Sequence, residues 1–439
     1  MTVYNGFALV RDVRLLNLDR GENRFIFDDV SPQMSPETAF LTDLSDDAPI
    51  WVHEQNFETA VLSPDVLFKQ AVGHTVTVIR DEPPGHETRE RAILVSQNGP
   101  ILKFRDRVET SLPPNSRIVY SSVPPMPLTP GFMVDFDSPA ATPHPIALDY
   151  LTGGLSWSAD YVARLNASAD LLDINAFITL RNDSGMGFDD ASVRVVAGDV
   201  QRVQPGEMRT TEGVPAMASA DVYAVTKSIA TRQAVFDFYE YTLPQRTSLR
   251  AGETKQSLLL YARGVPVRTV YSAMSGANDY TSQGSGQQSI PVGVTLQFQN
   301  DGHGLGVPLP TGIFHTYKTD QSGQSVFLGD DNIGNTPRSQ PVQLDMGTSF
   351  DLKVRRVQTN HQEIPHPNGR TEYLSDYRVT VSNAKTTTAV VEYAEQLGGN
   401  WQITKESLPH EKTTSSTVQW KISVPANGQT VLTYQVRVM

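Results

Sequence analysis

The chain has 439 residues, and 36 Lys and Arg against 48 Asp and Glu give a net charge of −12 at pH 7. Gly (31) and Pro (29) are frequent and charged residues make up only 19%, which excludes a helical bundle or a coiled coil. The acidic balance without a Lys/Arg-rich block excludes the electrostatic signature of a nucleic-acid-binding protein, and no run reaches the roughly 18 apolar residues of a membrane-spanning helix.

The first predicted element is a strand over Thr2–Val10, so the chain opens inside its first structural element. We therefore expect that an export signal has been removed. The chain has no cysteine, which excludes disulfides and thiolate metal sites and suits an oxidising compartment. The expected location is the bacterial envelope: the periplasm, the outer-membrane surface or the extracellular space.

Short alternating apolar segments, separated by Gly, Pro, Asn or Asp, follow along the whole chain. This spacing predicts an all-β protein with several β-sandwich or barrel domains in series and one or two short helices. One helix is expected over Ser63–Gly73, with Ser63 as N-cap and Pro64 in the first turn. The segment Ala216–Ala234 is expected to be either a second helix or a mobile insertion.

Asn-Gly pairs predict tight hairpins at 97–100 and at 426–429. The four prolines of 121–130 and the Gly, Ser and Gln residues of 275–289 indicate linkers. We therefore predict an N-terminal β domain over 1–125 with a small barrel-like insertion near 73–117. A central sandwich over 126–275 and a C-terminal sandwich over 290–439 follow.

A series of motifs over about residues 145–439 resembles the bacterial, envelope-associated family of mucoidy inhibitor A, whose C-terminal domain is a domain of unknown function. The motifs are Tyr150–Asn166, Asn182–Val203, Tyr239–Gln256, Gly304–Pro310, Phe327–Pro337 and Tyr377–Trp401. The resemblance implies β-sandwich domains in an exported protein and supplies no catalytic residues. Longer relatives carry a coiled coil, and because this chain has no heptads, an interaction through such a segment is not carried over.

Histidines provide two candidate metal sites. His361, Glu363 and His366 lie on a strand and a Pro-Asn-Gly turn, and could offer imidazole and carboxylate ligands to Zn²⁺ or Cu²⁺. His303 and His315 flank the Gly-rich segment 304–312 and could approach each other beside Asp301. The alternative in both cases is an ordinary polar loop, which the turn-forming Gly and Pro residues favour.

Three acid-rich loops, at 43–47, 182–190 and 329–332, offer the oxygen ligands that Ca²⁺ prefers. None follows the EF-hand pattern, so simple turns are the alternative.

Trp157 and Tyr161 share one face of a predicted strand and, with Trp401, could form a sugar-stacking platform. The competing interpretation places Trp157 in a sandwich core.

We expect a binding or assembly component of the envelope rather than an enzyme, with other envelope or surface-layer proteins as partners and polysaccharide as a further candidate. No catalytic residues are predicted. Strands such as His74–Arg80 or Thr430–Val438 could accept a partner strand at a sheet edge. The alternatives are a copper- or zinc-dependent oxidoreductase of the superoxide dismutase type and a carbohydrate-binding module.

Overall fold

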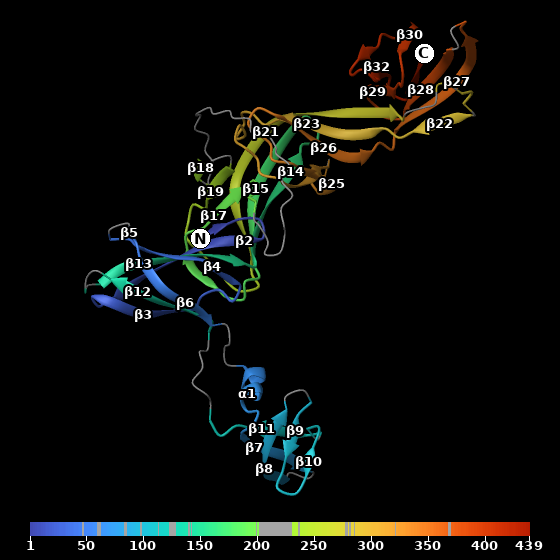
Figure 1. The fold of residues 1–439 in the computed structure, drawn as a ribbon. Coiled ribbons are helices and arrows are strands. Elements are labelled where there is room, and N and C mark those ends of the chain that lie inside the picture. The colour runs from blue at the N-terminus through green and yellow to red at the C-terminus, as the bar shows by residue number, and fades with distance from the viewer. Residues whose placement is uncertain are drawn as a thin grey trace. The chain divides into compact units, whose positions relative to one another are not determined.

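The fold is all-β, as predicted, and is shown in Figure 1 as a computed structural model. Within the described residues the only helix is α1 (Pro64–Gln70), capped by the Ser63 side chain, which accepts a hydrogen bond from the Val66 amide as expected. The structure describes residues 1–45, 48–58, 63–82, 86–96, 99–112, 114–122, 129–138, 141, 143–198, 200–201, 231–235, 238–276, 280, 282–284, 286–320, 322–367 and 370–439.

The chain divides into two compact units, each built from more than one segment. Unit 1 comprises residues 1–156, 181–193 and 246–254, and unit 2 comprises 157–180, 194–245 and 255–439. These limits do not coincide with the domain boundaries predicted from the sequence near residues 125 and 275–290. The division into three domains stays a prediction. No described helix is long and apolar enough to cross a membrane.

Unit 1 contains antiparallel sheets and a separate two-stranded pair. One sheet runs in the order β1-β2-β13-β4-β5, and another in the order β3-β12-β6. Their strands are β1 (Thr2–Val3), β2 (Phe7–Asn17), β3 (Gly21–Asp28), β4 (Met34–Asp43), β5 (Ala48–Pro49), β6 (Trp51–Glu58), β12 (Gly131–Ser138) and β13 (Pro143–Gly153). The pair consists of β16 (Phe188–Ala191) and β20 (Thr247–Leu249).

The predicted insertion near 73–117 is a five-stranded antiparallel sheet in the order β10-β9-β8-β7-β11. Its small core includes Leu94 and Leu102, and Phe68 of α1 packs against it. β8 and β9, which flank the hairpin predicted at 97–100, pair antiparallel, and residues 97–98 themselves lie outside the described residues. The strands are β7 (Thr75–Glu82), β8 (His86–Ser96), β9 (Ile101–Lys103), β10 (Val108–Glu109) and β11 (Ser116–Val119).

Unit 2 is built on a mixed sheet whose main path is β25-β24-β14-β15-β21-β29-β32-β31, with β23 paired to β21 and β26 paired to β23. β14 pairs with β24 in parallel, and β21 with β29 likewise. The strands are β14 (Leu155–Leu165), β15 (Leu171–Asn182), β21 (Thr254–Ser275), β23 (Gly293–Gln299), β24 (Gly312–Thr319), β25 (Ser325–Ile333), β26 (Pro341–Thr348), β29 (Ala389–Gln396), β31 (Glu411–Lys412) and β32 (Thr417–Val424).

A second sheet of unit 2 covers the C-terminal end of that path, in the order β22-β27-β28-β33-β30. The core between them includes Val391, Trp420, Ile422, Leu432 and Val436, all 0% exposed. The strands of this C-terminal sheet are β22 (Gln287–Ile290), β27 (Leu352–Pro365), β28 (Thr371–Asn383), β30 (Trp401–Glu406) and β33 (Gly428–Val438). Unit 2 also contains β17 (Arg194–Ala197), β18 (Thr231–Val235) and β19 (Phe238–Thr242), in the order β18-β19-β17.

Several local predictions are wrong. The strand expected over Thr2–Val10 is two strands, because the chain turns at Gly6 (φ +89°) and β1 folds back on β2. The Asn427-Gly428 pair does not close a hairpin: it carries the chain from β32 in one sheet to β33 in the other. Of the segment Ala216–Ala234, the described part begins at residue 231 in β18, and the rest lies outside the described residues.

Candidate functional site

The hairpin of β27 and β28 carries the predicted ligands His361, Glu363 and His366. His361 Nδ1 lies 2.9 Å from Ser375 Oγ, while His366 Nε2 lies 2.9 Å from Glu372 Oε2. Ser375 and Glu372 are three residues apart on β28 and so point to opposite faces. The structure therefore does not bring the two imidazoles together, and Glu363 is exposed on β27.

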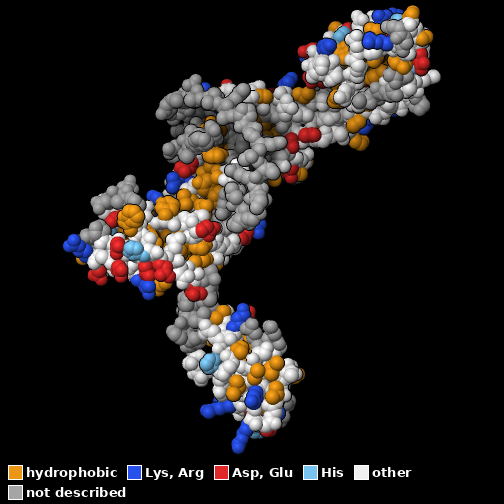
Figure 2. All heavy atoms as spheres, viewed as in Figure 1, with side chains coloured by type: hydrophobic (Ala, Val, Ile, Leu, Met, Phe, Trp, Pro, Cys, Tyr) orange, Lys and Arg blue, Asp and Glu red, His pale blue; other side chains and the backbone are white. Residues whose placement is uncertain are grey.

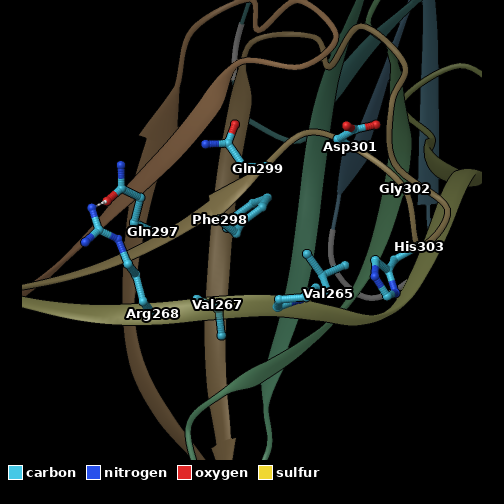
Figure 3. Close-up of a pocket in the computed structure, with 10 residues that line it drawn as sticks. Val265, Val267, Arg268, Gln297, Phe298, Gln299, Asp301, Gly302 and His303 are labelled. Carbon is cyan, nitrogen blue, oxygen red and sulfur yellow. Dashed lines mark hydrogen bonds between the residues drawn. The ribbon is translucent and has the colours of Figure 1, made fainter.

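His303 and Asp301 both line a cavity of about 680 Å³ beside β21 and β23. In Figure 3, Arg268 and Gln297 lie toward one end of this groove, and His303 lies toward the other. Val265 and other apolar side chains lie between them, so the groove has an apolar floor and polar ends. Such a groove is suited to an amphipathic ligand.

The second histidine of that prediction, His315, is not part of this cavity. It projects from β24, and its Nδ1 lies 2.7 Å from Asp330 Oδ1 on β25. Among the described residues, no group of three or more His, Asp or Glu side chains is placed to hold a metal ion. Copper, zinc and calcium binding stay predictions.

The aromatic platform predicted from Trp157 and Tyr161 is not formed. Tyr161 is 0% exposed, stacks on Phe314 and donates a hydrogen bond to the Pro310 carbonyl, so it presents no ring face to a sugar. Trp157 is partly buried and donates from Nε1 to the Val196 carbonyl. Trp401 lies on β30, in a different sheet, with Lys412 Nζ 4.6 Å from its ring centre.

The acid-rich loops are held mainly by partners within the chain. Asp43 contacts His144 and Asp183 contacts Arg181, at 2.7 and 2.6 Å. Asp331 accepts a hydrogen bond from the Asp345 amide. Asp46 and Asp47 lie outside the described residues. Most of these carboxylates are therefore already engaged in binding the protein's own donors.

Buried asparagines fix several of the turns. Asn182, Asn300 and Asn383 each follow or end a strand and are at most 2% exposed. Each Nδ2 donates to main-chain carbonyls and each Oδ1 accepts a main-chain amide, such as Lys385 N for Asn383. Asn182, expected in a calcium loop, is thus a turn-forming residue of the kind that buried polar groups require.

The most concentrated polar cluster, which the sequence reasoning missed, lies in the C-terminal core. Glu395 of β29 is 0% exposed, and its Oε1 lies 2.6 Å from Nε of Arg356, whose side chain is 4% exposed. The hydroxyls of Tyr280, Tyr393 and Tyr434 all donate hydrogen bonds to the Glu395 carboxylate. We call Glu395, Arg356 and these three tyrosines the carboxylate cluster.

Burial governs the ionisation of the carboxylate cluster. It raises the pKa of Tyr280, Tyr393 and Tyr434 above the ordinary value, and the neighbouring Glu395 charge adds to the effect. For Arg356, burial acts to lower the pKa, but the electrostatic contributions of Glu395 and the neighbouring tyrosines together outweigh it and the pKa is raised. The tyrosines thus stay neutral donors and Arg356 stays a cation. The Glu395 carboxylate is therefore paired with a cation and hydrogen-bonded inside the core, and the cluster links the two packed sheets.

The cluster had a signal in the sequence. Glu395 follows Val391 and Tyr393 at a spacing of two, on the face of β29 that is buried. An acid at an inward position requires a buried partner. Tyr280, which belongs to the segment interpreted as a flexible link, is 3% exposed and is one of those partners.

The edge strands also differ from expectation. His74–Arg80 corresponds to β7, which pairs with both β8 and β11, and Thr430–Val438 corresponds to β33, which pairs with both β28 and β30. Over Thr77–Arg80 and Tyr434–Val438, both sides of the strand are already paired, so these parts offer no free edge to a partner strand. In unit 2, β25 stands at one end of the main sheet path instead.

Comparison with known proteins agrees with the extent of the motifs noted in the sequence. A model of a domain of unknown function, DUF4139, matches residues 146–439, about two thirds of the chain. No curated protein matches the sequence. The name mucoidy inhibitor A stays an expectation from the resemblance. Through the β-rich region from β13 to β33, the chain belongs to the DUF4139 family.

Proposed function

We propose that this protein is a binding or assembly component of the bacterial envelope that pairs with an extended segment of a partner protein along β25. The observation that carries the proposal is the exposed apolar edge of that strand. Val326, Phe327 and Leu328 are 49%, 53% and 36% exposed. Because successive side chains of a strand point to opposite faces, apolar groups are exposed on both faces of β25.

The outer edge of β25 is open over only part of its length. Near its C-terminal end, Asp331 accepts a hydrogen bond from the Asp345 amide of β26. A register shift against β24 between Thr316 and Tyr317 interrupts the ladder beside Leu328. Within the described residues, the segment Ser325–Leu328 pairs only with β24.

Free main-chain groups at a sheet edge bind an extended partner chain, and neighbouring side chains give the pairing its specificity. Phe327 already packs against Tyr317, with ring centres 5.4 Å apart, so an aromatic surface lies next to the open edge. A partner segment with alternating apolar residues would cover Phe327 and pair with the main chain of β25. A short contact of this kind fits a reversible assembly interaction rather than a permanent one.

Location in the envelope is the second part of the proposal, supported by the absence of cysteine and by the family-like motifs. Fractionation of cells expressing the full-length native gene would test it. The protein is expected in the periplasmic, outer-membrane or extracellular fraction, and recovery in the cytosol alone would contradict this part.

The binding part is tested by Val326→Asp with Val390→Asp as a matched control. Both valines are 49% exposed, but Val390 lies on β29, which is paired on both sides by β21 and β32. A photo-crosslinking amino acid at each position, in cells, should link a defined partner from position 326 only. The purified partner should bind the wild type and Val390→Asp, and lose at least tenfold in affinity with Val326→Asp. Equal crosslinking at both positions would contradict the proposal.

A second candidate function is binding of an amphipathic small molecule in the groove of Figure 3, favoured by its apolar floor and by Arg268 at one end. The dye 8-anilinonaphthalene-1-sulfonate, an apolar ring system with one anionic group, is a suitable probe. Its fluorescence should rise on binding, and Arg268→Gln should weaken binding more than Arg164→Gln, a substitution on β14 outside the groove. Equal affinities would remove this candidate.

A further inference from the structure

The outer face of the C-terminal sheet, on the side away from the carboxylate cluster, is rich in cations although the chain as a whole carries −12. The alternation of β27, β28 and β33 places core residues on one face and polar residues on the other. Figure 2 shows Lys and Arg side chains, in blue, on the part of the chain that carries these strands. The cations of this outer face are Lys353, Arg355, Arg378, Lys405 and Arg437, and its carboxylates are Glu372 and Asp376.

The carboxylates on this face are already engaged. Glu372 contacts both Arg437 and His366. Asp376 accepts hydrogen bonds from Asn360 on one oxygen and from Gln435 on the other. Glu372 is thus paired with a cation, whereas Asp376 keeps its charge, so the face carries five cations against two carboxylates, 5 − 2 = +3.

The remaining cations lack acidic partners. In the part of the chain that the structure describes, the side chains of Arg355, Arg378 and Lys405 form no ion pair and no hydrogen bond, and all three residues are exposed. Lys353 lies over the ring of Phe350, which is 87% exposed, with Nζ 5.5 Å from the ring centre. The guanidinium and ammonium donors of this face are therefore available to a ligand.

These free cations follow a diagonal across the sheet, which we call the cationic stripe: Lys405, Arg378, Arg355 and Lys353. Lys405 is in register with Gln435, and Gln435 with Asp376, so Arg378 lies two positions further along β28. Arg355 is opposite Thr380, and Lys353 is opposite Ser382. With strands about 4.8 Å apart and a rise of about 3.3 Å per residue, the stripe is about 25 Å long.

A polar groove follows one end of the stripe. Its volume is about 360 Å³, at the small end of the usual range of roughly 300–1,000 Å³ for ligand pockets. Arg378 and Lys405 both line it, as do the acids Asp376 and Glu406, and its uncharged polar side chains include Thr433, Ser407 and Gln435. The hydroxyl and amide groups complement a ligand that carries many hydroxyls, and Arg355 and Lys353, which lie on the stripe beyond the groove, supply positive charge for its anionic groups.

We propose that the cationic stripe and this groove bind an anionic glycan, a chain of sugars that bears carboxylates or other oxyanions. The stripe would pair with the anionic groups, the hydroxyl and amide side chains would bond sugar hydroxyls, and exposed Phe350 would contact a sugar ring. A densely charged nucleic acid is disfavoured because the chain's net charge of −12 repels it. This site is independent of the proposed strand pairing at β25.

The test uses the full chain and hexagalacturonate, with its methyl ester as the matched neutral ligand. Calorimetric titration at low salt should show binding of hexagalacturonate, weakened as salt is raised, and at least tenfold weaker binding of the ester. The double variant R355Q/R378Q should lose at least tenfold in affinity for hexagalacturonate. The control Lys421→Gln removes a cation that is 63% exposed on β32 of the other sheet, and should bind like the wild type.

Thermal melting of each variant checks that the fold is retained, which is expected because the replaced side chains are exposed. The inference is overturned if hexagalacturonate does not bind, if the ester binds equally well, or if Lys421→Gln weakens binding as much as the double variant. If hexathymidylate binds more tightly than hexagalacturonate, and the double variant loses that binding, the stripe is a nucleic-acid site. That result would overturn the assignment to an anionic glycan.

Discussion

Two neighbouring arginines of β27 have opposite environments. Arg356 points into the C-terminal core, is 4% exposed, and is held by Glu395 with Nε 2.6 Å from Oε1. Arg355 points to the outer face, is exposed and has no partner within the described residues. The two faces of one sheet thus separate a charge that fixes the fold from charges that are available to a ligand.

The cause of the difference is desolvation. A buried charge is tolerated only when a partner and hydrogen bonds replace the lost water, and Arg356 also stacks on Tyr377 with Cζ 3.8 Å from the ring centre. An exposed cation keeps its water and costs the fold little. The inner face should therefore respond to substitution through stability, and the outer face through binding.

The largest expected effect comes from Glu395→Gln, which leaves Arg356 buried without a countercharge. The free energy of unfolding of the C-terminal core should fall by about 3–5 kcal/mol. Chemical denaturation followed by tryptophan fluorescence measures this loss. The background carries Trp51→Phe and Trp157→Phe, so that the signal comes only from Trp401 and Trp420, which belong to or pack against this core.

The double variant Glu395→Gln/Arg356→Met is the control for that prediction. It removes both charges together and keeps an amide oxygen as acceptor for the tyrosine hydroxyls, so it should recover most of the lost stability. A double variant as unstable as Glu395→Gln would show that the carboxylate cluster acts through shape rather than through charge pairing.

A smaller effect is expected from Asn383→Ala, which removes the donor for the carbonyls of Thr387, Val424 and Pro425. Leaving buried carbonyls without a partner costs about 1–3 kcal/mol. The same unfolding measurement applies, and the exposed Asn332→Ala should change stability by less than about 0.5 kcal/mol. Equal losses at both sites would contradict the role assigned to the buried asparagine.

Alkaline pH should weaken the inner face further. Because the folded-state pKa of Tyr280, Tyr393 and Tyr434 is raised, these groups keep their protons in the folded chain while the unfolded chain loses them near pH 10. The unfolded state then binds fewer protons, so stability is full below pH 10 and falls as pH rises above it, by up to about 1.4 kcal/mol per unit for each tyrosine.

Tyr280→Phe sharpens this prediction, because it removes one of the titrating groups. The free energy of unfolding, measured from pH 9 to 11.5, should fall less steeply with pH in the variant. The difference in slope should approach the contribution of one titrating group, about 1.4 kcal/mol per pH unit. The exposed Asn332→Ala, which removes no titrating group, serves as the control and should keep the wild-type slope. An unchanged slope in Tyr280→Phe would contradict the raised pKa.

The smallest change in stability is expected on the outer face. Arg355→Gln and Arg378→Gln should alter the free energy of unfolding by less than about 0.5 kcal/mol, as exposed substitutions usually do. A loss of stability comparable with that of Asn383→Ala would show that these cations stabilise the fold. That result would contradict the assignment of the outer face to binding.

The sequence was sufficient for the all-β class, the capped helix at Ser63 and the C-terminal family region, because these depend on local chemistry and periodicity. It was insufficient at Asn427-Gly428, where the same turn residues can close a hairpin or link two sheets. The choice there is made by distant strands: β29 pairs with β32, while β28 and β30 enclose β33.

The candidate sites were less predictable because they depend on residues far apart in the chain. Tyr280, Arg356 and Glu395 meet only after the two C-terminal sheets pack, and nothing local marks them as partners. The cationic stripe likewise follows from the register of β27, β28, β33 and β30. Tyr161 shows the opposite error, since its aromatic character fitted a sugar platform but its burial places it in the core.

The most direct test of the separation between the two faces compares Arg355→Gln with Arg356→Gln in one experiment, measuring hexagalacturonate affinity and unfolding free energy for each. The predicted result is that Arg355→Gln weakens binding while unfolding is unchanged, and that Arg356→Gln lowers the unfolding free energy of the C-terminal core. Unchanged affinity in Arg355→Gln, or unchanged stability in Arg356→Gln, would contradict it.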